Sequence, residues 1–190
     1  MPPQMGRALI LFLAAVGGLI VVVVVAFALV AGTYRAPSES MVPTLGVGSR
    51  FTVLKFGDAG VGDVVVVNPP LGAESDIEAM CGGGPPDVGR MCAKPTAKKA
   101  EIKFVTRVVA VGGDRISMRG GKIVRNGKPE TTRGPVGCDG DGCDYPQEIT
   151  VPKNHLFLLG DNRGASDDSR FWGPVPEKWL IGKLWFVYKD

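Results

Sequence analysis

The chain has 190 residues, 45% of them hydrophobic, and a formal net charge of +3, so it is long enough for one compact domain with a core. Its basic residues are scattered rather than gathered into a run, which argues against a nucleic-acid-binding protein. Gly and Pro are frequent, with 27 and 15 residues, and Val-rich runs lie between them. This composition indicates a mainly β protein with many turns.

An apolar run without charge covers residues 8–32. As a helix it is long enough to cross the ~30 Å hydrocarbon core of a bilayer. We predict a transmembrane helix at 8–32, preceded by a short segment at 1–7 and followed by a domain at 36–190. A cleaved signal peptide is the alternative, because Ala26-Phe27-Ala28 has the small-x-small pattern of a cleavage site, but the run exceeds the usual apolar region of such peptides.

All four cysteines lie beyond this run: Cys81, Cys92, Cys138 and Cys143. Their spacing does not fit paired C-x-x-C zinc motifs, so disulfides are favoured and no metal is expected. Three pairings are possible, and the simplest joins Cys81 to Cys92 and Cys138 to Cys143. Four free thiols in a reduced protein are the alternative. Disulfides would place the domain in an oxidising compartment, with residues 1–7 in the cytoplasm.

Short strands are predicted from alternating or continuous apolar runs at residues 50–56, 64–67, 101–111, 115–124, 156–159 and 180–188. The run at 64–67 consists of valines and is expected to be buried on both faces. Asn126-Gly127 predicts a tight hairpin turn. Two stretches rich in Pro, Gly and charge, 68–99 and 128–148, are expected to be surface excursions. Beyond the apolar run, only a turn near 176–178 has helical character, so the domain is predicted to be mainly β.

A serine-rich loop, Ser38-Glu39-Ser40-Met41-Val42-Pro43-Thr44, follows the apolar run. Alone, such a loop is typical of a linker, although a hydroxyl held near a membrane by Pro43 could also be a nucleophile. Three further blocks follow it in order: Gly62-Asp63-Val64, Arg107-Val108-Val109-Ala110-Val111-Gly112-Gly113-Asp114, and Gly160-Asp161-Asn162-Arg163 continuing to Arg170. Together the four blocks resemble bacterial type I signal peptidases. The resemblance implies a β-rich catalytic domain of the signal peptidase type behind one N-terminal transmembrane helix.

The resemblance also implies roles for individual residues. Ser40 would attack the scissile carbonyl and become the acyl-enzyme. Its backbone N–H and the Ser38 hydroxyl would form the oxyanion hole. The fourth block supplies the residues that support the site: Asp161, Ser166, Asp168 and Arg170. Among them, Ser166 would orient the general base, and Asp168 would brace the loop through an ion pair with Arg170.

The general base departs from the family pattern. In the family, a lysine immediately precedes the Arg of the third block, and here that position is Thr106. A threonine hydroxyl cannot act as a base near neutral pH. Lys103 is a possible substitute, but a β-bulge would be needed to turn it inward. Lys98 and Lys99 are two further candidates. The third is His155, the only histidine in the sequence, and we interpret His155 as structural.

These observations lead to two hypotheses. The first is a membrane-anchored serine endopeptidase that removes signal peptides from exported preproteins after small residues. The second is a signal-peptidase-like binding or regulatory protein without turnover, because Thr106 replaces the base. A relative of the self-cleaving repressors is disfavoured by the apolar run. We expect the partners to be signal peptides and the lipid bilayer. No nucleic acid and no cofactor are expected, and the protein is expected to be a single-pass monomer in the cell membrane with its domain outside.

Overall fold

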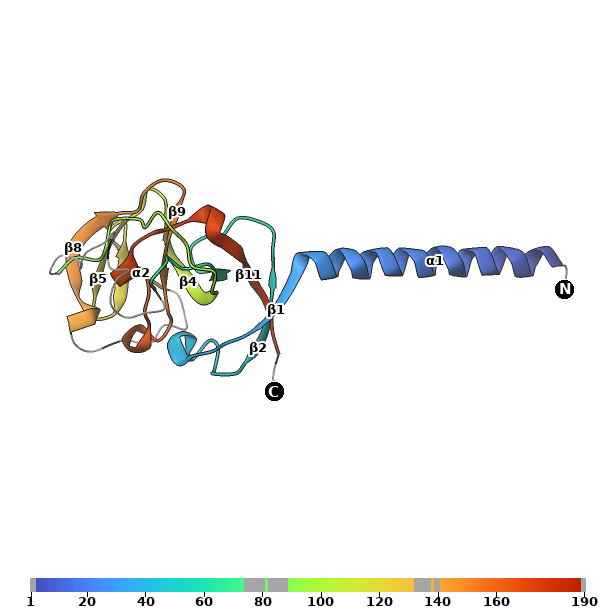
Figure 1. The fold of residues 1–190 in the computed structure, drawn as a ribbon, viewed down its shortest axis with the longest axis horizontal. Helices are drawn as coiled ribbons and strands as arrows, with labels where there is room; N and C mark the ends of the chain where they lie inside the picture. Colours follow the sequence, from blue (N-terminus) through green and yellow to red (C-terminus); the bar gives the residue numbers. More distant parts are fainter. Residues whose placement is uncertain (1–2, 74–80, 82–88, 132–137, 139–140, 189–190) are drawn as a thin grey trace.

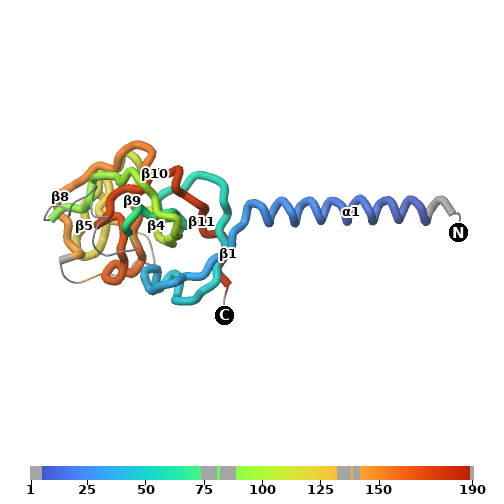
Figure 2. The backbone as a smooth tube through the Cα atoms, viewed as in Figure 1, coloured from blue at the N-terminus to red at the C-terminus, as the bar shows by residue number. Residues whose placement is uncertain are grey.

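The computed structural model describes residues 3–73, 81, 89–131, 138 and 141–188. Helix α1 (Pro3–Val30) projects from a domain built of two β-sheets, and the C-terminus lies close to the junction between helix and domain (Figure 1, Figure 2). The span Gly6–Val30 has a mean hydropathy of 3.2, and none of it is buried against the rest of the chain. By length and composition this helix could cross a membrane.

The helix ends before the predicted apolar span does. Ala31 and Gly32 belong to strand β1 (Ala31–Arg35), which pairs antiparallel with β2 (Arg50–Leu54). The Lys55 N–H donates to the Val30 carbonyl at 2.8 Å, so the chain enters the sheet directly from the helix. Apolar composition alone does not mark this boundary, because it is set by pairing with a later strand.

Seven strands form the larger sheet, in the order β1-β2-β11-β3-β4-β9-β10. The strands not yet located are β3 (Val64–Val67), β4 (Phe104–Val111), β9 (His155–Leu159), β10 (Val175–Pro176) and β11 (Leu180–Val187). All neighbouring strands are antiparallel. The four valines of β3 are all buried, which confirms the predicted burial on both faces. The sheet therefore places β4 and β9 side by side.

The smaller sheet contains four strands in the order β7-β6-β5-β8: β7 (Lys128–Pro129), β6 (Lys122–Arg125), β5 (Arg115–Arg119) and β8 (Tyr145–Thr150). The single strand predicted at 115–124 is a hairpin instead. Gly120 and Gly121 break it with φ angles of 51° and 75°, a left-handed conformation that glycine adopts without steric cost. The predicted turn at Asn126-Gly127 is present and connects β6 to β7.

The rest of the domain contains short helices and two disulfides. The short helices are η1 (Glu39–Met41), η2 (Asp141–Cys143), η3 (Arg163–Ala165), α2 (Ser169–Trp172) and η4 (Glu177–Trp179). The turn predicted near 176–178 corresponds to η4, whereas α2 was not predicted. The disulfides join Cys81 to Cys92 and Cys138 to Cys143, which confirms the predicted pairing. Residues 74–80, 82–88, 132–137 and 139–140 of the two predicted excursions lie outside the described residues. The mainly β class is confirmed.

Candidate active site

The loop that carries Ser40 is fixed on two sides. Next to Ser40, Met41 is fully buried and packs in a core cluster with Phe51 and Val53 of β2. The Ser40 carbonyl accepts a hydrogen bond from the Asn162 N–H at 2.9 Å. The Met41 side chain thus anchors the loop to the core, and the Asn162 N–H anchors it to the segment after β9. The Ser40 side chain remains partly exposed between them.

The two predicted catalytic hydroxyls lie together. The Ser38 hydroxyl donates to Ser40 Oγ at 3.1 Å. Both serines line a cavity of about 340 Å³, and Thr106 of β4 and Ser166 line the same cavity. Its apolar walls are Phe104, Val105 and Trp172, among others. The structure therefore brings the nucleophile, its neighbouring hydroxyl, the family's lysine position and Ser166 to one cavity.

Thr106 occupies a buried position in β4, where it pairs with Val65 of β3. Only 5% of the residue is exposed, and its Oγ1 has no hydrogen-bond partner among the described residues. Trp172 is 2% exposed, and its Nε1 also has no partner there. Buried polar atoms without a partner are rare in native proteins. Two residues that line the same cavity therefore each retain an unsatisfied polar atom.

The structure does not bring the alternative bases to this cavity. Lys103 is exposed, lies before the first residue of β4 and is not part of the lining. The β3–β4 pairing is regular from Phe104 to Arg107, so the bulge that would turn Lys103 inward is absent from this described segment. Lys98 and Lys99 are exposed. His155 begins β9, and its Nδ1 lies 2.8 Å from the Lys153 carbonyl oxygen.

Asp161 lies at the point where all four sequence blocks meet. Its carboxylate is fully buried and accepts hydrogen bonds from Arg107 Nε at 2.7 Å and Arg107 Nη2 at 2.6 Å. Thr44 Oγ1 donates to the same carboxylate. Arg107 Nη1 donates to the Gly62 carbonyl at 2.6 Å. Thr44, Gly62, Arg107 and Asp161 come from the first, second, third and fourth blocks, so this network fixes the blocks relative to one another.

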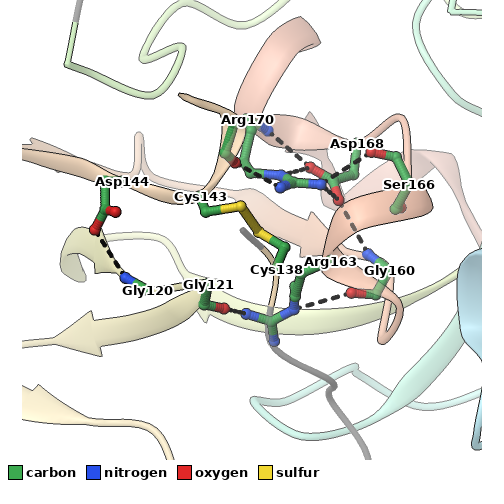
Figure 3. Close-up of a disulfide and its surroundings, with 11 residues drawn as sticks. Gly120, Gly121, Cys138, Cys143, Asp144, Gly160, Arg163, Ser166, Asp168 and Arg170 are labelled. Carbon is green, nitrogen blue, oxygen red and sulfur yellow. Dashed lines mark hydrogen bonds and ion pairs between the residues drawn. A yellow bond between two sulfur atoms is a disulfide. The ribbon is translucent and has the colours of Figure 1, made fainter. Parts of the chain in front are cut away.

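Asp168 and Arg170 form the predicted ion pair. Arg170 Nε donates to Asp168 Oδ1 at 2.8 Å, with both side chains 2% exposed, and Asp168 also caps the N-terminus of α2 (Figure 3). Burial by itself lowers the pKa of the Arg170 guanidinium, but the charge and hydrogen bonds of Asp168, together with the charges of Tyr145 and Asp167, outweigh this effect and raise the pKa. Arg170 Nη2 donates to the Ser166 carbonyl at 2.9 Å. The pair therefore holds the segment that carries Ser166.

Gly160 allows Ser166 to approach the nucleophile loop. A methyl group at Gly160 would lie 2.1 Å from Ser166 Oγ and 2.6 Å from the Ser40 carbonyl oxygen. The Gly160 N–H donates to Asp168 Oδ2 at 3.2 Å, and its carbonyl accepts from Arg163 Nε at 2.9 Å (Figure 3). Only glycine therefore fits at this crossing point.

Several contacts of the site had no signal in the sequence. Asn162 and Arg163 belong to the fourth block, but nothing in the sequence indicates their contacts. Arg163 is buried and pairs with Glu130 beyond β7 at 2.9 Å, which ties the fourth block to the smaller sheet. Trp172 contacts the cavity from α2, a helix too short to show a periodic pattern. These contacts depend on chain segments that meet only in the folded domain.

A serine on a fixed loop, with a second hydroxyl beside it and a cavity next to it, is part of the arrangement of a serine hydrolase, which also needs a general base. The family model described as "Signal peptidase, peptidase S26" matches residues 9–189 of the chain. The chain therefore belongs to the signal peptidase S26 family.

Relatives of known annotation agree with this assignment. The chain is 34% identical over 158 residues to "Probable thylakoidal processing peptidase 2, chloroplastic" of Arabidopsis thaliana, covering 80% of this chain and 36% of that protein. It is 31% identical over 160 residues to "Probable signal peptidase I-1" of Synechocystis, covering 80% of this chain and 68% of that protein. A signal peptidase I structure from Enterococcus faecalis V583 aligns with a TM-score of 0.43 and 19% identity, over 68% of this chain and 99% of that one. The family assignment rests on the sequence matches.

Proposed function

We propose that this chain is a membrane-anchored serine endopeptidase of the signal peptidase I type. It removes signal peptides from exported preproteins after small residues, through an acyl-enzyme on Ser40. The observation that carries the proposal is the position of Ser40 on a loop anchored by Met41, with the Ser38 hydroxyl 3.1 Å from its Oγ and a cavity beside it. Membership of the S26 family supports the reaction class.

The proposed reaction begins when Ser40 Oγ attacks the scissile carbonyl carbon. The negative charge that develops on the carbonyl oxygen is stabilised by the Ser40 N–H and the Ser38 hydroxyl, each worth about 2.7–4 kcal/mol. The C–N bond then breaks, the mature protein leaves with a protonated amine, and water hydrolyses the acyl-enzyme. Each half of the reaction needs a group that accepts and returns a proton.

The group that accepts the proton of Ser40 determines the expected rate of cleavage. The described residues that line the cavity include neither lysine nor histidine. A positioned general base contributes typically about 10²–10⁴-fold to such reactions. We therefore expect Ser40 to turn over slowly, with Thr106 as the limiting residue.

The helix and the disulfides support a proposal for the location of the protein. We propose that α1 crosses the membrane once, with the N-terminus in the cytoplasm and the disulfide-bonded domain outside. Trp185 and Phe186 of β11 are about half exposed, and the Trp185 ring lies 5.5 Å from that of Phe27 on α1. Aromatic side chains are typical of the membrane–water interface, so this position supports a domain that sits at the bilayer surface. The partners are lipid and the signal peptides of preproteins, and we expect a monomer.

Thr106 favours a second candidate, a signal-peptide-binding or regulatory protein without turnover. Such a protein would retain the cavity and the Ser40 loop but release its ligand intact.

The test is incubation of the full chain, in detergent micelles, with a preprotein whose signal peptide ends in small residues. Mass spectrometry of the products identifies the cleaved bond. The endopeptidase predicts slow cleavage after a small residue, which disappears in Ser40→Ala. Residual cleavage that is equal in Ser40→Ala would remove Ser40 as nucleophile. Tight binding of the signal peptide with no product from either wild type or Thr106→Lys would favour the binding protein.

A further inference from the structure

The cavity beside Ser40 is rich in hydroxyl groups, and its described lining contains no lysine or histidine. Four hydroxyl-bearing residues from three chain segments line it: Ser38, Ser40, Thr106 and Ser166. Its apolar wall includes Phe104, Val105 and Trp172. Among the described lining residues, Asp167 has the one acidic side chain, and it is exposed. These surroundings suit a small ligand that has a polar group and an apolar body.

Two of the lining residues retain an unsatisfied polar atom. Thr106 Oγ1 and Trp172 Nε1 are both buried without a partner among the described residues, and both residues belong to this cavity. After rotation about χ1, Thr106 Oγ1 would accept a hydrogen bond from a bound ligand. Threonine has more than one favoured χ1 rotamer, so this rotation is accessible. An alkylamine donates such a hydrogen bond with its nitrogen, while its carbon chain packs on Phe104 and Val105.

We propose that this cavity binds a primary amine, which serves as the general base that the chain itself does not place beside Ser40. The inference rests on the proposed endopeptidase function. The neutral amine accepts the proton of Ser40 Oγ as the bond between Oγ and the scissile carbonyl carbon forms. The resulting ammonium gives this proton to the departing substrate nitrogen as the C–N bond breaks. In deacylation the amine takes a proton from water, and that proton returns to Ser40 Oγ when the acyl bond breaks.

Two sources could supply this primary amine, and both have the same chemical group. It is either a free small amine or the side chain of a lysine in the substrate close to the cleaved bond. Both present a primary amine on an unbranched alkyl chain, and the cavity volume of about 340 Å³ leaves room for such a chain.

The experiment measures cleavage of a lysine-free signal-peptide substrate by the full chain in micelles, as the concentration of methylamine, ethylamine or propylamine is raised. Tetramethylammonium chloride keeps the ionic strength constant. The proposal predicts a saturable increase of at least about tenfold, within the range of general-base catalysis, that follows the concentration of neutral amine as the pH is varied. The increase requires Ser40, and the product is a free carboxylate. Branched tert-butylamine should give a weaker increase, because its branched carbon cannot lie along Phe104 and Val105 as an unbranched chain does.

Two variants locate the amine. Thr106→Val keeps the volume of the side chain but removes the hydroxyl, and it should raise the amine concentration needed for half-maximal rate. Thr106→Lys fills the site, so its rate should no longer depend on added amine. A second substrate with a lysine near the cleaved bond identifies the source: faster cleavage of it without added amine assigns the base to the substrate.

Three results would overturn the inference. The first is a rate that rises linearly and equally with all amines, including tert-butylamine. The second is an amide product, which would show that the amine attacks the acyl-enzyme instead of activating Ser40. The third is no increase with any amine while Thr106→Lys is active, which would remove the amine site but leave the endopeptidase intact. If neither added amine nor Thr106→Lys produced cleavage, the proposed endopeptidase function would fail together with the inference.

Discussion

Arg107 holds both carboxylate oxygens of Asp161, with Nε 2.7 Å from Oδ1 and Nη2 2.6 Å from Oδ2. This pair joins β4 to the segment after β9, and the Thr44 hydroxyl on the same carboxylate adds the Ser40 loop. Because Thr106 precedes Arg107 in β4, the pair also fixes Thr106 next to that loop. The geometry of the candidate site therefore depends on a buried charge pair that is itself outside the cavity lining.

We predict that Arg107→Met destabilises the domain strongly. The substitution leaves the Asp161 carboxylate buried without its partner, and removing one member of a buried ion pair costs about 3–5 kcal/mol. Urea unfolding followed by circular dichroism measures the change. The matched control is Lys99→Ala, because Lys99 lies 4.0 Å from Glu101 in an exposed pair. An exposed pair contributes about 0–1 kcal/mol. Equal effects of the two substitutions would contradict the structural role of Asp161.

Gly160→Ala should separate Ser166 from the Ser40 loop. The added methyl group would lie 2.1 Å from Ser166 Oγ and 2.6 Å from the Ser40 carbonyl, so one of the two segments must move. Cleavage, including that of Thr106→Lys, is expected to fall by at least about tenfold, because a small displacement of reacting groups is costly. Gly164→Ala is the control: its nearest contact, with Cys138 Cβ, is at 3.4 Å. Unchanged cleavage in Gly160→Ala would show that this contact does not position the site.

Both disulfides support the segment that carries Ser166. The N–H groups of Cys92 and Cys81 donate to the Arg170 and Phe171 carbonyls at 2.9 and 3.0 Å, and Arg170 Nη1 donates to the Gly142 carbonyl inside the second loop. Replacing either cysteine pair with serines should lower stability by about 2–4 kcal/mol.

The loss should be larger for the first pair. Its sequence separation is 11, against 5 for the second, and loop-closure entropy predicts a difference of about 0.7 kcal/mol. Thermal unfolding of the two double variants measures this order. A larger loss from Cys138→Ser with Cys143→Ser would show that contacts around η2 outweigh loop entropy.

Asp114 gives the domain an acid-sensitive contribution. Burial raises the pKa of its carboxyl, but hydrogen bonds from the Val111 N–H and Asn126 and the charge of Arg125 outweigh burial, so the pKa is lowered. A lowered pKa in the folded state contributes stability above the unfolded value of about 3.9, and this contribution is lost as the pH falls through the folded value. The stability difference between wild type and Asp114→Asn should therefore be constant from about pH 5 to 7 and shrink below about pH 4. Urea unfolding at several pH values tests this, and a difference that persists undiminished at about pH 3 would contradict it.

Lys103→Ala should leave cleavage unchanged within about twofold. The side chain is exposed, and the regular pairing of β4 with β3 keeps it out of the cavity lining. A general base would be worth about 10²–10⁴-fold, so the two outcomes are well separated. Loss of cleavage in this variant would make Lys103 the base and would end the case for Thr106 as the limiting residue.

Local patterns predicted the parts of the fold that depend on local chemistry. The valine run forms β3, and its four side chains are buried as predicted. The disulfides join the cysteines that are close in sequence, also as predicted. Gly120-Gly121 broke a predicted strand, because two residues with positive φ form a turn even inside an apolar pattern. The start of β1 could not be predicted, since only pairing with β2 distinguishes Ala31 and Gly32 from the helix.

The candidate site was predictable as a set of residues but not as a geometry. Four motif blocks indicated Ser40, Asp161 and Arg170 before any contact was known. That the blocks meet at one buried carboxylate, and that Trp172 faces the same cavity as Thr106, depends on the order of strands in the sheet. Strand order arises from long-range packing, which a short motif does not encode.

If Ser40 is a competent nucleophile limited by the residue at position 106, the rate must respond to a lysine at that position. The most direct measurement is kcat/KM for a signal-peptide substrate in wild type and Thr106→Lys, with Ser40→Ala in both backgrounds. We expect Thr106→Lys to raise kcat/KM by about 10²-fold or more and Ser40→Ala to abolish cleavage in both. Brisk cleavage by the wild type that Thr106→Lys does not change would contradict this expectation.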